Sequence, residues 1–275
     1  MSATAIAAGP RKWLNTAIGV LLLSIMLFPV YWMVNAALQP NTTVLETTLL
    51  PLRPSFDAFA AVWSAQAPNL RTSIVVALGT TLLCLMVATP AAYGLSRRGV
   101  PGTSTYLFGV LLTQMIPAIV IANGLYAGFI RFGLLNTHAG LILANSTAAV
   151  PFAILVIRAF MVAIPFELME AARLDGAGQL RTFLSIVVPV SRNAIITAGL
   201  FAFLAGWNDF LFAVTLTSNT NIRPVTLGIY EYLGTNVDDW ALVMATATIA
   251  SIPAIVLLVV AQRFIAAGTN TTGLK

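Results

Sequence analysis

The sequence repeats one feature along its whole length: predominantly apolar stretches that are each about 20 residues or longer. A stretch of this length crosses the hydrocarbon core of a bilayer as a helix, because each backbone amide must find its partner within the segment. Only 8% of the residues are charged and 59% are hydrophobic, which leaves too little polar surface for a water-soluble fold. We therefore predict an all-α, polytopic membrane protein, a single transmembrane domain over residues 1–275, with six helices at about 14–37, 72–95, 105–129, 139–161, 193–216 and 241–262.

The 14 basic residues are distributed unevenly over the segments between these spans. Basic residues near the ends of spans are retained in the cytoplasm. One orientation places ten of them inside: Arg11, Lys12, Arg97, Arg98, Arg158, Arg173, Arg181, Arg192, Arg263 and Lys275. The net charge of +5 therefore indicates topology and not a nucleic-acid surface. We predict a multi-pass protein of the cell (inner) membrane with both termini in the cytoplasm.

A cleaved leader is the alternative interpretation of the first span. The triplet Val34-Asn35-Ala36 resembles a signal-peptidase site, but the apolar region of a leader is only ~7–15 residues long. The apolar run from Trp13 to Leu38 is longer than that. We therefore favour an uncleaved first span.

The only long cytoplasmic segment, residues 162–192, has the pattern of two short helices joined by a turn. Pro165 suits a helix start, and Asp175-Gly176 ends that helix after Leu174 because glycine permits a backbone turn that other residues resist. A second helix from Ala177 places three apolar side chains on one side: Leu180, Phe183 and Leu184. This pattern predicts a rigid projection with an apolar knob that fits a groove on a cytoplasmic partner. A helix lying in the lipid interface is the alternative.

Polar side chains inside predicted spans are candidates for a substrate path, since such groups are costly in lipid and face a bundle interior or a wet cavity. Asp209 is the clearest case, because an ionised carboxylate there needs a donor or water. The whole candidate set is Gln114, Asn123, Asn145, Trp207, Asn208 and Asp209. Interhelical hydrogen bonds that hold the spans together are the alternative role.

The predicted outer loop from Thr217 to Trp240 carries aromatic and charged side chains that suit a transient polar interface. The candidates are Arg223, Tyr230, Glu231 and Tyr232. A solvated connector is the alternative.

Sequence motifs for catalysis or nucleotide binding are missing from the sequence. The only lysines are Lys12 and Lys275, and no glycine-rich loop ends in Gly-Lys-Ser or Gly-Lys-Thr, so the sequence has no loop of this type for binding ATP. His138 and Cys84 are each the only residue of their type and have no ligand companion. We predict no catalytic residues, no metal site and no cofactor in this chain.

The string EAARLDGA at 170–177, with Ile186 and Pro189 after it, resembles the EAA loop of permease subunits in binding-protein-dependent ABC importers. The strings AAYGLSRRGVPG at 91–102, GLLNTHAGLIL at 133–143 and GWNDFLFAVTLTS at 206–218 resemble the carbohydrate-uptake branch of this family, most closely its six-span maltose-transporter permease. The C-terminal AAGTNTTGLK departs from the glycine and alanine rich ending that is common in the family.

The resemblance implies the type I importer permease fold and a coupling role for the loop. By matching positions, the residues that contact the ATPase are Glu170, Ala171, Ala172, Asp175, Gly176, Ala177, Leu180, Phe183 and Pro189. It also implies a second permease subunit, two ATPase subunits that bind ATP and Mg, and an extracytoplasmic solute-binding protein or lipoprotein that contacts the outer loop. Membrane lipid surrounds the assembly.

Two other classes of function are the alternatives to an importer permease. A secondary transporter would use Asp209 as a protonatable carrier, and a membrane enzyme would need a polar catalytic cluster at one interface, which the sequence does not offer. Within the importer interpretation the substrate is a carbohydrate, with a polyol, an amino sugar or a glycerol phosphate ester as alternatives.

Overall fold

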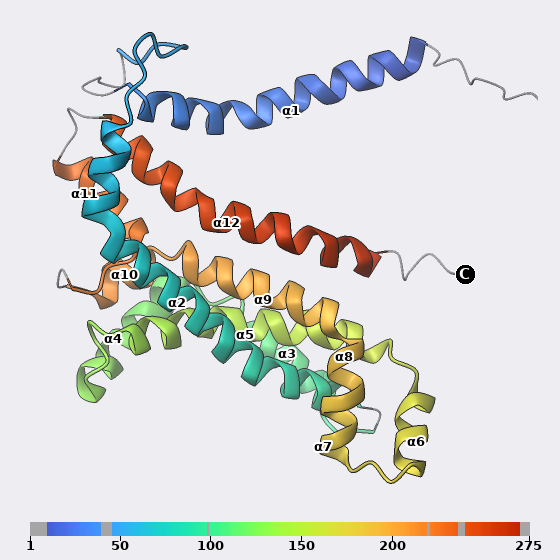
Figure 1. Cartoon of the computed structure of the whole chain (residues 1–275). Helices are drawn as coiled ribbons and strands as arrows, with labels where there is room; N and C mark the ends of the chain where they lie inside the picture. Colours follow the sequence, from blue (N-terminus) through green and yellow to red (C-terminus); the bar gives the residue numbers. More distant parts are fainter. Residues whose placement is uncertain (1–9, 40–45, 98, 219–220, 236–239, 270–275) are drawn as a thin grey trace, which may run out of the picture. The chain divides into compact units, whose positions relative to one another are not determined.

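A computed structural model describes residues 10–39, 46–97, 99–218, 221–235 and 240–269, all of them in helices or in the turns between helices. Figure 1 shows the helices with the labels used below. The chain divides into two compact units: Met1–Ala65 with Glu231–Ile249, and Gln66–Tyr230 with Ala250–Lys275. Each unit is described by itself.

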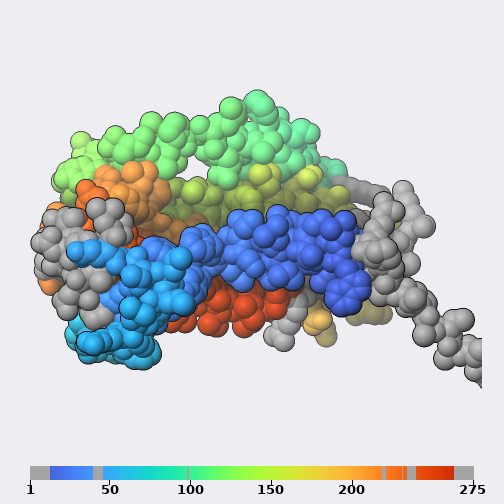
Figure 2. Space-filling model, turned by 90° about the horizontal axis from the view of Figure 1, so that it is seen from above, coloured from blue at the N-terminus to red at the C-terminus, as the bar shows by residue number. Residues whose placement is uncertain are grey.

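The first unit contains α1 (Pro10–Ala37), the beginning of α2 (Asp57–Ser96) and the beginning of α12 (Trp240–Thr269). Figure 2 shows α1 as one continuous blue rod, and no residue of its most apolar 18-residue window is buried. Only its last turn packs, against a small cluster formed by Ala37, Ala58, Val62, Ala241 and Ala245. Small side chains allow these helix backbones to approach closely.

The segment after α1 is tied back to that helix by side-chain amides. Asn35 and Gln39 both donate to the carbonyl oxygen of Thr48, at 2.6 and 2.9 Å, and the Thr48 backbone amide donates to the Gln39 side chain at 3.1 Å. Tyr31 also donates to the carbonyl of Leu49. These contacts hold residues 48 and 49 against the end of α1, and residues 40–45 lie outside the described part.

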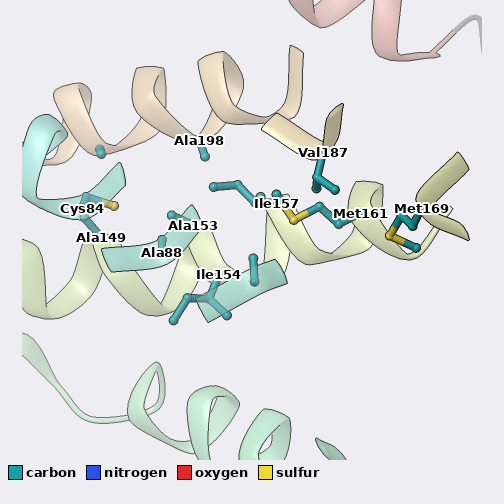
Figure 3. Close-up of a cluster of buried hydrophobic side chains, with 12 residues drawn as sticks. Cys84, Ala88, Ala149, Ala153, Ile154, Ile157, Met161, Met169, Val187 and Ala198 are labelled. Atoms are coloured by element: carbon teal, nitrogen blue, oxygen red, sulfur yellow. The ribbon is translucent and has the colours of Figure 1, made fainter. Parts of the chain in front are cut away.

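The second unit is organised around α5 (His138–Val162), which packs along α9 (Arg192–Trp207). One apolar cluster fills the space between α2, α5 and α9, with small residues on α2 and larger ones on α5 (Figure 3). It contains Cys84, Ala88, Ala153, Ile157, Met161 and Ala198. A second cluster joins α2 and α5 to α4 (Ala118–Phe132) and α10 (Leu211–Leu216). Figure 2 shows the green helices α3 (Thr103–Thr113) and α4 alongside the yellow-green α5.

In the described part, four helices are long and apolar enough to cross a membrane: Trp13–Ala37, Asp57–Ser96, His138–Val162 and Trp240–Gln262. The count rises to six if each bent helix pair is one span. The predicted spans at 14–37, 139–161 and 241–262 match continuous helices. The predicted span at 72–95 is the second part of a longer helix that begins at Asp57.

The predicted spans at 105–129 and 193–216 are not continuous helices. The first is broken between α3 and α4, whose axes differ by 91°, because Pro117 has an extended ψ of 135° and cannot donate to a preceding carbonyl. The second is interrupted at Asn208–Phe210, between α9 and α10. By contrast, Pro90, Pro151 and Pro253 lie inside uninterrupted helices.

Candidate functional site

The segment 162–192, which is predicted to be cytoplasmic, begins with the short helix that the sequence predicts. α6 (Phe166–Leu174) follows Pro165, has Glu167 in its first turn and has Arg173 in its last turn. These charges complement the helix dipole, which is positive at the N-terminus and negative at the C-terminus. The predicted end of the helix at Leu174 is confirmed.

Gly176 closes α6 in a left-handed turn with φ of 79°. The amide of Gly176 donates to the carbonyl of Arg173 at 3.0 Å, and that of Ala177 donates to Ala172 at 2.9 Å. This pair of bonds is the Schellman arrangement, which satisfies carbonyl groups that a helix end otherwise leaves open. The turn predicted at Asp175-Gly176 is therefore confirmed, and glycine is the residue that adopts it without strain.

The second arm of the projection is longer than the sequence predicts. It consists of α7 (Gln179–Thr182), the π-helical segment η1 (Phe183–Val187) and α8 (Val188–Val190), and it meets α9 at 77°. The amide of Val188 donates to the carbonyl of Phe183, five residues back. This wider turn keeps the ring of Pro189 from clashing with the carbonyl four residues before it, as it would in an α-helix.

Some side chains of the two arms are buried within the second unit, and others are exposed. Met169, Ala172, Thr182 and Val187 are buried, and Figure 3 shows Met169 and Val187 at the end of the cluster that follows α5. Three leucines at or near the tip are largely exposed: Leu174 at 89%, Leu180 at 71% and Leu184 at 55%. Glu170, Ala171, Asp175 and Pro189 are also exposed.

Phe183 differs from the other residues that we assigned to the apolar knob. Its side chain is half-buried and its ring lies 4.9 Å from that of Tyr93 on α2, measured between centroids. It therefore faces the second unit, and of the three residues of the predicted knob only Leu180 and Leu184 are exposed.

Asp209 lies in the break between α9 and α10, and hydrogen bonds engage its carboxylate. It accepts from the backbone amides of Phe212 at 3.0 Å and Ala213 at 3.1 Å, and from the Asn145 side chain at 3.3 Å. Its own carbonyl accepts from the hydroxyl of Thr226. Asp209 thus caps α10 and connects it to α5 and α11 (Val225–Thr235).

The other candidates for the substrate path divide by exposure. Trp207 is 3% exposed, and its indole donates to the carbonyl of Ala250 at 3.1 Å. Asn145 is equally buried, whereas Gln114, Asn123 and Asn208 are exposed. Gln114 lies at the break between α3 and α4, and Asn123 lies on α4. Burial of Trp207 and Asn145 argues against direct substrate contact in this conformation.

The predicted outer loop contains a helix that the sequence analysis did not identify, α11. Tyr230 on this helix is exposed, and its ring lies 5.2 Å from that of Phe210. Arg223 and Tyr232 are half-buried. The side chain of Glu231, residues 236–239 and the end of the C-terminal tail, 270–275, lie outside the described residues.

Two further residues that contact the projecting segment were not identified from the sequence. Tyr93 lies on α2, and Arg97 directly follows that helix. Their spacing of four on a helix was the available signal. Partial burial lowers the pKa of Arg97, and the nearby positive charge of Arg173 lowers it further.

Within the described residues, no group of three or more His, Cys, Asp or Glu side chains is placed to hold a metal ion.

The described part of the chain has four to six candidate membrane spans and a two-armed projection. The model of the family described as "Binding-protein-dependent transport system inner membrane component" matches residues 85–271. The chain belongs to this family. It is a permease subunit of an ABC importer and not an enzyme.

Curated relatives agree with this assignment over nearly the whole chain. The chain is 31% identical to the trehalose transport system permease protein SugB of Mycobacterium tuberculosis, over 90% of this chain and 92% of the relative. It is 28% identical to the trehalose/maltose transport system permease protein MalG of Thermococcus litoralis, over 94% and 95%.

A solved structure supports the fold. It is a chain of a bacterial ABC transporter that imports the acidic polysaccharide alginate, and it aligns with a TM-score of 0.78 over 96% of this chain and 99% of that chain. The two sequences are 20% identical, so this likeness concerns the fold alone.

Proposed function

We propose that this permease forms half of the translocation path of a carbohydrate importer and takes its energy from a separate ATPase through the projecting segment 162–192. The names of the two relatives, which transport trehalose or maltose, support the substrate class. The proposed assembly contains a second permease, two ATPase subunits that bind ATP and Mg, and an extracytoplasmic solute-binding protein.

The proposed site of ATPase contact is the exposed tip of the projection. Leu174, Leu180 and Leu184 expose apolar surface on a segment whose opposite side is anchored in the second unit. Exposed apolar surface on a rigid helical segment is typical of a docking site for a partner groove. This exposure is the observation that carries the proposal.

The proposed orientation has both termini and the projection in the cytoplasm of a cell with an inner membrane. It follows from the excess of basic residues in the segments on that side of the spans. The projection would then meet ATPase subunits, and α11 with Tyr230 would meet the solute-binding protein on the opposite side.

The proposed mechanism is a change of access driven by the ATPases. Closure of the ATPases on ATP moves the projections of both permeases, and this motion opens the path towards the binding protein. ATP can shift this equilibrium only through its different affinities for the two states. The Schellman turn at Gly176 supports the mechanism, since a fixed turn transmits displacement better than a flexible one.

The substrate path is proposed to run past the exposed polar residues Gln114, Asn123 and Asn208. Trp207, Asn145 and Asp209 hold the break between α9 and α10 instead. Because the Asp209 carboxylate already accepts three hydrogen bonds, the structure favours the importer over a proton-driven secondary transporter.

The test is uptake by the complete transporter, reconstituted in liposomes with its partner subunits and binding protein. We expect labelled trehalose or maltose to enter only with ATP, and entry to persist when an ionophore dissipates ion gradients. A variant ATPase subunit that cannot hydrolyse ATP is the control, and it should abolish uptake. Uptake without ATP, or uptake that the ionophore stops, would contradict the proposal, and entry of a polyol or glycerol phosphate ester alone would change the substrate class.

A further inference from the structure

The C-terminal end of α2 contacts both arms of the projection, although it lies far from them in the sequence. Tyr93 is on the last turn of α2, and Arg97 follows that helix directly. The guanidinium of Arg97 lies over the Tyr93 ring, with its Cζ atom 4.2 Å from the ring centroid. A guanidinium in this position is attracted by the negative face of the ring.

Arg97 connects to the first arm. Its Nη1 atom contacts the sulfur of Met169, which lies on α6 and is 8% exposed. A thioether is a weak acceptor and a polarisable contact. Arg97 also lines a cavity of about 190 Å³ beneath the first arm, together with Pro165 and Glu167.

Tyr93 connects to the second arm. Its ring lies against Phe183 with an angle of 41° between the ring planes. Its hydroxyl is buried and has no hydrogen-bond partner in the described part of the chain. The ring of Tyr93, and not its hydroxyl, therefore makes the contacts that hold this junction.

These contacts form a continuous chain from Met169 through Arg97 and Tyr93 to Phe183. The polypeptide backbone, by contrast, connects the projection directly only to α5 and α9. A hydrogen bond from Arg158 Nε on α5 to the carbonyl of Leu95, at 3.0 Å, fixes the same end of α2 to the helix that leads into the projection.

We propose that Tyr93 and Arg97 are positioning residues that transmit movement of the projection to α2. The inference rests on the proposed function, since it assumes that the ATPases move this segment. Displacement of α6 carries Met169 against Arg97, and displacement of η1 carries Phe183 against Tyr93. Both arms therefore act on one helix end, and α2 moves with them even though no peptide segment links the two directly.

The experiment compares two substitutions of Tyr93 in the reconstituted complex. Tyr93→Leu removes the aromatic face that Arg97 and Phe183 share, and we expect the sugar taken up per ATP hydrolysed to fall by roughly three- to tenfold. Tyr93→Phe keeps the face and removes only the unpaired hydroxyl, so the ratio should stay at the wild-type value. Co-purification of the ATPases and the thermal midpoint of the complex are measured for both variants, because a loss of structure alone would lower these and not the ratio.

Substitutions of Arg97 test the same proposal if the Tyr93→Leu variant does not assemble with its partner subunits. Arg97→Gln removes the charge over the ring and should lower the uptake ratio, and Arg97→Lys, which keeps the charge without the planar face, should lower it less. An unchanged ratio in Arg97→Gln, or equal losses in Tyr93→Phe and Tyr93→Leu, would overturn the inference. If wild type itself shows no ATP-dependent uptake, the proposed function fails instead, so the two failures are distinguishable.

Discussion

The projection and the break at Asn208–Phe210 carry the two most distinctive motifs of the sequence, yet their side chains are arranged in opposite ways. The projection exposes Leu174 and Leu180. At the break, by contrast, Trp207 is buried and the Asp209 carboxylate is fully engaged. Apolar groups that are exposed outside the predicted membrane spans are typical of a docking surface, and satisfied polar groups indicate internal architecture. We therefore propose docking as the role of the first motif and helix positioning as the role of the second.

The largest effect should come from Gly176→Pro. Proline fixes φ near −65° and has no amide hydrogen, so it can neither adopt the observed φ of 79° nor donate to Arg173. We expect the chain to insert normally and ATP-driven import to fall to background. The control is Gly178→Ala, since Gly178 has a φ of −66° and a Cβ there would meet nothing within 4 Å. Normal import by Gly176→Pro would show that the turn has no part in coupling.

Leu180→Asp tests the docking half of the comparison directly. A charge in the centre of an apolar contact should weaken ATPase binding by about 30-fold, or ~2 kcal/mol. Co-purification with the ATPase subunits at increasing dilution measures the effect. Gln179→Asp places the same charge one residue away, in the first turn of α7, where the helix dipole favours it, and it should leave binding intact. Equal loss in both variants would point to charge in general and not to the leucine.

Asp209→Ala tests whether the break between α9 and α10 has the proposed architectural role. The substitution removes the acceptor for the amides of Phe212 and Ala213, and loss of such a cap costs about 1–2 kcal/mol. Thermal unfolding of the purified complex should show the lower stability, with import reduced only as far as folded protein is lost. Asn208→Ala, at an exposed neighbour, should leave the thermal midpoint unchanged. Unaltered stability with abolished import would return Asp209 to the substrate path.

The smallest effects are expected for substitutions of Trp207 and Gln114, the first on stability and the second on the KM for sugar. Trp207→Phe loses one buried hydrogen bond to Ala250 and should cost about 1 kcal/mol of stability without changing the KM for sugar. Gln114→Ala removes an exposed amide and should raise KM with no loss of stability. Thermal unfolding and initial uptake rates on both variants distinguish these outcomes, and a higher KM in Trp207→Phe would mean that the indole faces the path.

Much of the fold was predictable because hydropathy and length alone determine continuous spans. The helices α1, α5 and α12 follow directly from their apolar runs. Which proline breaks a helix was not predictable, because Pro117 interrupts a helix while Pro90, Pro151 and Pro253 do not. Residue type does not distinguish these cases, since neighbouring helices decide whether a freed carbonyl is tolerated.

For the projection, local chemistry was sufficient to predict the first helix and its glycine turn. The inward position of Phe183 was not predictable, since its spacing from Leu180 placed both on one helical side. The contact with Tyr93 depends on a helix 90 residues earlier in the chain and on a π-helical turn, and neither has a signal in the local pattern. The roles assigned to these residues stay predictions.

The π-helical segment η1 has a consequence for how the projection tolerates changes of length. A π turn is equivalent to a single residue inserted into an α-helix. Removing one residue between Phe183 and Val187 would restore regular winding and would rotate α7, with Leu180, by roughly 100° about the helix axis. The number of residues in this short stretch therefore sets the orientation of Leu180. We expect relatives that share this orientation to keep the same number of residues between Leu180 and Pro189.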